Sequence, residues 1–256
     1  GMLERILTDV RKRIPELIEN EREIRAAGER QAPVRDFAAA IKAPGLSVIA
    51  EVKRASPSKG LLDEGLDPAG LASRYQAGGA AAISVLTEPE HFRGSLEDLR
   101  SVRARVSVPV LRKDFILHPV QVWEGRAAGA DALLLIVAVL DDQTLHGLLA
   151  ETRLAGMVAL VEVHTAEEAK RAVATGATVV GVNNRDLRSF AVDLRTAESI
   201  APLLEDVPVR VAESGISSRG DAVRMATAGY HGVLVGESLV RADDPAALVA
   251  ELRGAR

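Results

Sequence analysis

Residues 128–136 read AGADALLLI, and this stretch decides the architecture of the chain. Glycine at the end of a helix adopts the left-handed conformation, so the first three residues predict the point where a helix stops. A short run of aliphatic residues follows almost at once, which is typical of a strand buried on both faces of a parallel sheet. The stretch therefore predicts a junction between a helix and a parallel strand.

The same pattern recurs from residue 47 to the end of the chain. Eight short apolar runs alternate with segments long enough for a helix and two loops, which predicts parallel strands joined by helical crossovers. The second, fourth, sixth and eighth runs follow an Ala/Gly-rich junction, and a Val-Pro-Val triplet leads into the third and seventh. The runs are 47–50, 82–86, 108–111, 132–136, 158–161, 179–182, 209–212 and 232–235.

Eight such units predict an α/β fold, a (β/α)8 TIM barrel. We expect one domain over residues 1–256, with a helical extension at 1–46 and the barrel at 47–256. An open doubly wound sheet is the alternative, but the chain lacks the Gly-rich turn of dinucleotide-binding sheets. Apolar residues at helical spacing predict an amphipathic helix over 2–19 that lies on the main body and restarts at Pro15. Residues 20–46 predict a short helix and a connection.

The composition excludes several classes of function. The net charge of -4 gives no broad nucleic-acid footprint, and the absence of cysteine excludes disulfides and thiolate metal sites. No apolar run reaches the length of a membrane span, and the N-terminus lacks a signal-peptide core. We expect a cytoplasmic monomer with neither a nucleic-acid nor a membrane partner. The five histidines lack metal-ligand spacing, and Trp123 is expected to pack rather than bind substrate.

Charged residues follow the predicted strands at the ends where barrel enzymes carry their active sites. Glu51 and Lys53 leave the first strand two residues apart, so both side chains point to the same side. One such residue is usually solvated, but several at one mouth shift each other's pKa values, as acid–base catalysis requires. A lysine serves as a proton donor where its neighbours and burial lower its pKa. The other polar strand ends are Lys113, Glu162, Asn183 and Glu213.

The loops after the last two strands predict a phosphate site. Residues 214–217 read SGIS and residues 236–238 read GES. Many barrels bind phosphate with these two loops and the N-terminus of a short extra helix, where glycine lets the backbone approach and free N–H groups favour an anion. Residues 56–60, SPSKG, add hydroxyl groups and a cation after the first strand. From the residues alone, the chain is a phosphate-ligand barrel with acid–base groups.

The strand-end segments resemble those of the indole-3-glycerol phosphate synthase family, in order and over nearly the whole chain. The resemblance implies that a phosphorylated small molecule, 1-(2-carboxyphenylamino)-1-deoxyribulose 5-phosphate, is closed to an indole with loss of CO₂ and water, without a cofactor or metal. Ala55 departs from the basic residue of some members, which affects one supporting phosphate contact. The matching segments are 51–60 (EVKRASPSKG), 111–116 (LRKDFI), 161–164 (VEVH), 181–187 (GVNNRDL), 213–216 (ESGI) and 236–239 (GESL).

The resemblance also implies roles for individual residues. Lys113 would be the general acid of ring closure, and Glu162 the acid–base partner of dehydration. Lys53 would pair with the substrate carboxylate and donate a proton later, and Glu51 would orient these groups. The further implied residues are Asn183, which positions Glu162 and the substrate; Glu213 and Ser214, in the same catalytic mouth; Ser56, Arg185, Ser214, Gly215, Gly236, Glu237 and Ser238, for substrate and its phosphate; and Phe92, Phe115, Leu134, Leu187 and Leu234, an apolar wall for the anthranilate ring.

Three other functions remain open on the residues alone. A Schiff-base aldolase would use Lys113 or Lys53 as its nucleophile, and borohydride with a carbonyl substrate would trap it. A phosphate-sugar isomerase would move protons without releasing CO₂. A phosphate-binding barrel without catalysis would lose nothing when Lys113 is replaced. The segment 54–63 combines Ser, Pro, Lys and Gly, which suggests a mobile lid over the substrate.

Overall fold

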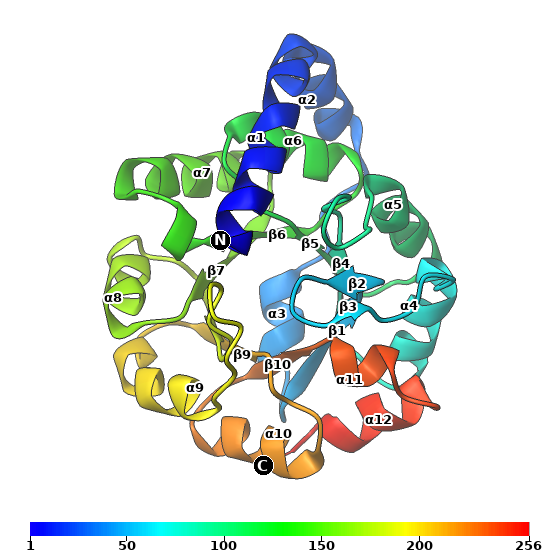
Figure 1. Ribbon diagram of the computed structural model, residues 1–256, viewed down its shortest axis with the longest axis vertical. Helices are drawn as coiled ribbons and strands as arrows, with labels where there is room; N and C mark the ends of the chain where they lie inside the picture. The colour runs from blue at the N-terminus through cyan, green and yellow to red at the C-terminus, as the bar shows by residue number, and fades with distance from the viewer. Residues whose placement is uncertain (256) are drawn as a thin grey trace.

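The computed structural model describes residues 1–255, in which eight parallel strands close into a ring surrounded by helices (Figure 1). Each strand neighbours the next in the sequence, and the first pairs with the last, which confirms the predicted barrel and excludes an open sheet. The barrel strands are β1 (Ser47–Val52), β4 (Ala82–Leu86), β5 (Val110–Lys113), β6 (Ala132–Ile136), β7 (Val158–Val163), β8 (Val179–Asn183), β9 (Val209–Glu213) and β10 (Gly232–Val235).

Helices cover the outside of the ring between successive strands (Figure 1). Each of the four Ala/Gly-rich junctions contains one glycine with positive φ, as predicted for the end of a helix: Gly79, Gly129, Gly176 and Gly229. No helix within residues 1–255 is long and apolar enough to cross a membrane. The outer elements are α4 (Pro68–Ala77), α5 (Leu96–Arg105), α6 (Pro119–Ala127), η1 (Val137–Val139), α7 (Asp142–Leu154), α8 (Ala166–Ala174), α9 (Arg195–Ile200), η2 (Ala201–Leu204), α10 (Arg219–Thr227), α11 (Glu237–Val240) and α12 (Pro245–Leu252).

The N-terminal extension forms three helices, α1 (Met2–Glu19), α2 (Glu21–Arg30) and α3 (Phe37–Lys42). The predicted restart at Pro15 is wrong, because α1 runs through this residue. Proline removes the bond to the carbonyl one turn earlier, and that carbonyl belongs to Arg11, an exposed residue where water replaces the lost donor. Residues 20–46 contain two helices where the sequence predicted one.

Alternate strand residues point into the barrel and out toward the helices. In β1, Ile49 belongs to an inner apolar cluster, whereas Val48 and Ala50 pack outward. The inner cluster also contains Phe37 and Ile41 of α3, which contacts β1, β4 and β9. Trp123 is buried on α6 and donates a hydrogen bond to Glu151, in agreement with the predicted packing role. The inner cluster also includes Leu134 and Leu234, which lie near the C-terminal ends of their strands.

Candidate active site

A cavity of about 550 Å³ opens at the C-terminal ends of the strands. It is large enough for a small substrate, and its wall combines apolar residues with a few convergent polar groups. Every residue that the sequence analysis assigned to the site lines it: Glu51, Lys53, Ser56, Phe92, Lys113, Phe115, Leu134, Glu162, Asn183, Arg185, Leu187, Glu213, Ser214, Gly215, Leu234, Gly236, Glu237 and Ser238.

Glu51 is the hub of the charged groups. Its two carboxylate oxygens lie 3.0 Å from Lys113 Nζ and 3.5 Å from Lys53 Nζ. The hydroxyl of Ser84, which is also inward-facing, donates to the same carboxylate at 2.8 Å. Burial alone would raise the pKa of Glu51, but the two ammonium charges and the hydroxyl outweigh it and lower the pKa. Glu51 is therefore an anion that holds both lysines at the mouth.

The two lysines differ in their tendency to release a proton. Burial lowers the pKa of Lys53, and the charges of Lys113 and Arg185 lower it further against the pull of Glu51. Burial also acts to lower the pKa of Lys113, but the neighbouring acidic groups, above all the Glu51 carboxylate, outweigh it and raise the pKa. The lysine with a lowered pKa is therefore Lys53, whereas Lys113 holds its proton more firmly than an ordinary lysine.

Glu213 is a buried carboxyl group without a polar partner. It is 1% exposed, and within residues 1–255 neither of its side-chain oxygens has a hydrogen-bond partner. Burial and the neighbouring charge of Glu162 raise its pKa well above the usual range, although Lys113 opposes them. Gly181 of β8 makes room for this group, since a Cβ there would lie 2.5 Å from Glu213 Oε2. The raised pKa favours the neutral, protonated form of Glu213 beside Glu162.

Asn183 contacts the loop after β9. Its side-chain oxygen accepts the Ser214 hydroxyl at 2.8 Å and the Arg185 amide at 2.9 Å. The described part of the chain contains no hydrogen bond between Asn183 and Glu162, so Asn183 does not hold Glu162 directly. Ser214 has φ of 69°, an unfavourable conformation for a residue with a Cβ. The bond from Asn183 helps to hold this strained serine at the mouth.

The loops after β9 and β10, which were predicted to bind phosphate, both line the cavity. Helix α11 begins at Glu237, directly after β10, and is the short extra helix that the sequence analysis expected. The Glu237 carboxylate lies 3.4 Å from Arg241 Nε, which offsets its charge next to an anion site. Ser238 donates to the carbonyl of Ile216 at 3.0 Å and so joins α11 to the loop after β9. Arg185, which follows β8, hydrogen-bonds the hydroxyl of Ser58 in the segment after β1.

Several cavity residues were not assigned to the site from the sequence. Leu3 and Ile6 come from α1, which the sequence predicted only as a packing helix. Phe190 and Val192 lie in the loop after β8, and Arg241 is the residue that directly follows α11. A buried apolar face looks the same in the sequence whether it covers a core or a substrate. No signal in the chain separates these two uses of α1.

The chain is a (β/α)8 barrel with ionisable groups at its mouth and Gly/Ser loops after its last two strands. These features define an acid–base enzyme of the (β/α)8 class. The family model described as indole-3-glycerol phosphate synthase matches residues 3–252. This chain belongs to that family. A protein of that name from Mycolicibacterium gilvum is 53% identical over 98% of this chain and 92% of its own length. Another from Kineococcus radiotolerans is 54% identical over 90% of this chain and 86% of its own length.

Solved structures of proteins with low sequence identity to this chain share the architecture. Thiamine phosphate pyrophosphorylase from Pyrococcus furiosus superposes with a TM-score of 0.61 at 18% identity and covers 85% of this chain and 96% of its own. A 3-hexulose-6-phosphate synthase gives a TM-score of 0.64 at 18% identity, over 82% of this chain and 99% of its own. At such low identity the similarity concerns the barrel and not the reaction.

Proposed function

We propose that this chain converts 1-(2-carboxyphenylamino)-1-deoxyribulose 5-phosphate into indole-3-glycerol phosphate, CO₂ and water, a step of tryptophan biosynthesis. The observation that carries the proposal is the pair of lysines on Glu51, with Glu162 and Glu213 beside them, between an apolar wall and a phosphate side. Such a cavity suits a substrate with an aromatic ring at one end and a phosphate at the other.

Ring closure needs a proton donor at the ketone oxygen. Lys113 keeps its proton because carboxylates surround it, so it is in the donor form when the substrate arrives. The aromatic carbon attacks the ketone while Lys113 protonates the oxygen that becomes a hydroxyl group. Lys53 pairs with the substrate carboxylate until the carbon–carbon bond to it breaks and CO₂ leaves, which restores the aromatic ring.

Dehydration needs a second proton transfer. Lys53 has the lowered pKa, so it gives a proton to the departing hydroxyl more readily than Lys113 does. Glu162 takes the proton that leaves the ring system, and the anionic Glu51 stabilises the cation between the two events. Glu213 holds its own proton, which limits repulsion beside Glu162.

The remaining expectations concern the whole chain. We expect residues 1–256 to form one domain, and the apolar cluster that Leu3, Ile6 and Val10 share with the inward residues of the strands supports this expectation. The protein acts as a cytoplasmic monomer on a phosphorylated small molecule. Size-exclusion chromatography with light scattering tests the monomer, and a stable dimer would contradict it.

The direct test supplies the carboxyphenylamino-deoxyribulose phosphate and follows indole fluorescence. We expect turnover by the wild type, and a folded protein that gives no signal would contradict the proposed function. Lys113→Ala should remove nearly all activity and Glu162→Gln most of it, on the order of a hundredfold or more for a lost acid–base group. Near-normal turnover by Lys113→Ala would overturn its role. Release of CO₂ excludes an isomerase, and failure of borohydride trapping excludes a Schiff-base mechanism.

A further inference from the structure

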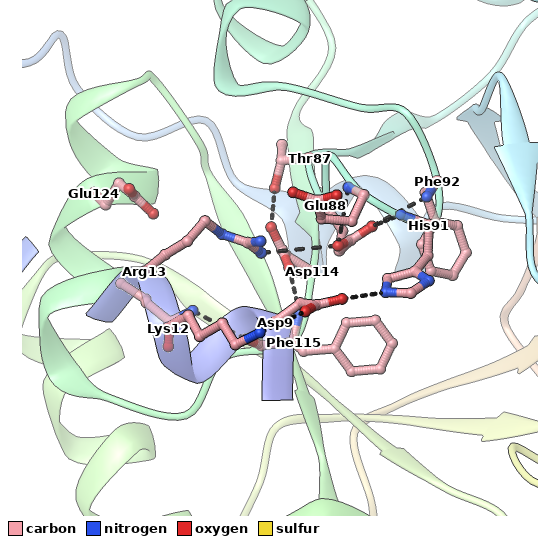
Figure 2. A network of polar contacts seen from close by, with 12 residues as sticks. Asp9, Lys12, Arg13, Thr87, Glu88, His91, Phe92, Asp114, Phe115 and Glu124 are labelled. Atoms are coloured by element: carbon pink, nitrogen blue, oxygen red, sulfur yellow. Dashed lines mark hydrogen bonds and ion pairs between the residues drawn. The ribbon is translucent and has the colours of Figure 1, made fainter. Parts of the chain in front are cut away.

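Two buried carboxylates hold the backbone of Phe92 and Phe115, two of the three phenylalanines that line the cavity. Phe92 N donates to Glu88 Oε1 at 3.0 Å, and Phe115 N donates to Asp114 Oδ1 at 2.7 Å. The two rings lie with their centroids 6.2 Å apart and their planes inclined at 42° (Figure 2). Glu88 is fully buried, lies outside the cavity wall, and takes no part in the chemistry above. Its burial therefore requires another explanation.

Glu88 fixes a tight turn after β4. Its carboxylate also accepts the amides of His91 at 2.6 Å and Glu90 at 3.1 Å, so one side chain holds three successive N–H groups. Its own carbonyl accepts the Gly94 amide at 2.9 Å. A Cβ at Gly94 would lie 2.1 Å from the carbonyl oxygen of Leu86, so only glycine lets the turn close against the strand end. The turn is thus built around one carboxylate.

Helix α1 holds the same turn from outside. His91 Nε2 lies 2.8 Å from Asp9 Oδ2, and Arg13 lies 3.8 Å from Glu88 Oε2 (Figure 2). The hydrogen bond from His91 lowers the pKa of Asp9, which keeps this carboxylate in its accepting form. The side chain of Glu88 therefore lies between its own turn and a cation on the helix that also carries two cavity residues.

The second carboxylate ties this turn to the neighbouring strand. Thr87, directly before Glu88, donates its hydroxyl to Asp114 Oδ2 at 2.6 Å and its amide to the Lys113 carbonyl at 3.1 Å. Arg112 donates to the same threonine oxygen at 3.0 Å. The ends of β4 and β5 are therefore joined within one polar network, and each end carries one of the two rings.

We propose that Glu88 is a positioning residue that, with the Asp9–His91 pair, sets the place of Phe92 against Phe115 and so the affinity for the aromatic end of the substrate. This inference rests on the proposed function. Glu88 acts through backbone amides and not on reacting atoms. The ring contacts it governs hold the substrate and the transition state alike, so their loss raises KM and leaves kcat nearly unchanged.

Glu88→Gln tests the proposal. The amide retains one oxygen, but its NH₂ group meets the Glu90 amide, so at least one of the three bonds is lost. We expect KM to rise about tenfold with kcat within about twofold of wild type. The matched control is Glu90→Gln, an exposed charge on the same turn, which should leave both constants unchanged. An unchanged KM for Glu88→Gln overturns the proposal, whatever its kcat.

A second variant tests the Asp9–His91 pair without changing a buried side chain. Asp9→Ala keeps a good helix former in α1 and removes the partner of His91. We expect KM to rise about threefold, with kcat unchanged, for one partly exposed hydrogen bond. Glu16→Ala on the same helix has an exposed side chain and is the control. Equal KM values for Asp9→Ala and Glu16→Ala would show that the Asp9–His91 pair does not position the ring of Phe92.

Hydrogen exchange separates the inference from the proposed function, because it needs no turnover. The amides of residues 90–92 should be protected in the wild type and exchange at least about tenfold faster in Glu88→Gln. A wild type with protected amides and no product would contradict the proposed reaction. If the wild type turns over substrate normally and the amides exchange at the same rate in the wild type and in Glu88→Gln, then Glu88 does not stabilise the turn.

Discussion

Glu213 has a raised pKa, which favours its protonated form and is the least expected property of the site. Its strand position was predicted from the sequence, because it ends a strand of the barrel like Glu51 and Glu162. Its raised pKa was not predicted, because it depends on burial and on the distance to Glu162, which belongs to another strand. Burial without a donor disfavours the charged form, so the folded protein binds a proton that the unfolded chain releases.

Stability should therefore fall with rising pH through this group. Its contribution is fully present below the unfolded pKa, near 4.5, and is lost as pH rises through the raised folded pKa. Glu213→Gln, which is always neutral, should lack this loss. Urea unfolding at several values between about pH 5 and about pH 8 would show wild type losing stability relative to the variant. Exposed Glu205→Gln is the control, and parallel curves for wild type and Glu213→Gln would contradict the assignment.

The alternation of strand residues predicted that Glu51 and Lys53 share one side, and the structure places both on the same cavity wall. Their contact with Lys113 depends on a strand from elsewhere in the barrel, and the opposite pKa directions of the two lysines depend on which carboxylates surround each. Local sequence determines the direction of a side chain, whereas its proton affinity is a property of the assembled mouth.

At the scale of the element, α1 is both a packing helix and part of the cavity wall. Its amphipathic pattern predicted the first role correctly, and Leu3, Ile6 and Val10 are buried. The second role could not be predicted, because it depends on where the helix lies on the barrel, and that position depends on contacts far along the chain. Figure 1 shows the N-terminal end of α1 near β6 and the rest of the helix passing over α6, which it contacts.

Ile6→Ala should affect stability and substrate binding together. Ile6 is 3% exposed, so the truncation should lower the free energy of unfolding by about 2–4 kcal/mol. Because Ile6 also lines the cavity, KM should rise as well. Ile18→Ala, on the same helix but 43% exposed, should change the stability by less than about 0.5 kcal/mol and leave KM unchanged. Equal effects of the two variants would contradict this account of α1.

The segment 54–63 remains a predicted lid. It contains a short antiparallel hairpin of β2 (Ala55–Ser56) and β3 (Gly60–Leu61), which the sequence did not predict. The two strands share only two residue pairs, which is few for a hairpin that is stable by itself. We therefore expect the amides there to exchange within seconds in the free enzyme, and more slowly when a phosphorylated substrate is bound. Strong and uniform protection in the free enzyme would count against a mobile lid.

At the scale of the molecule, one end of the barrel carries the cavity and the other end contributes to stability. The cavity lies at the C-terminal ends of the strands, and a second buried carboxylate system lies at the opposite end, just before β6. Asp131 is fully buried there, accepts the amides of Arg35 at 2.9 Å and Val110 at 2.7 Å, and lies 2.5 Å from Arg103. In barrels this end contributes to stability rather than to the reaction.

Asp131→Asn should therefore destabilise the protein without changing catalysis. Removing one member of a buried ion pair should lower the free energy of unfolding by about 3–5 kcal/mol, with kcat and KM of the remaining folded enzyme unchanged. Glu198→Gln breaks the exposed pair with Arg224 and should change the stability by less than about 1 kcal/mol. A clear rise of KM in Asp131→Asn would show that the two ends of the barrel are coupled.

The number of strands and their order around the ring followed from the repeated junctions in the sequence, because a parallel strand with a helical crossover is a local unit. Closure of the ring did not follow from any one junction. It depends on Ser47 lying opposite Gly232 and Val48 opposite Val233, two segments at opposite ends of the barrel sequence. Only the count of eight regular units made a barrel the preferred interpretation.

The pairing of β1 with β10 has a consequence for synthesis of the chain. As the polypeptide leaves the ribosome, β1 finds β4 early but keeps one edge without a partner until the last strand has emerged. The rate of maturation is therefore governed by a contact between distant segments, which forms slowly. During that interval the unpaired edge of β1 is open to other nascent chains, and we expect chaperones to act on this protein before its last strand is in place.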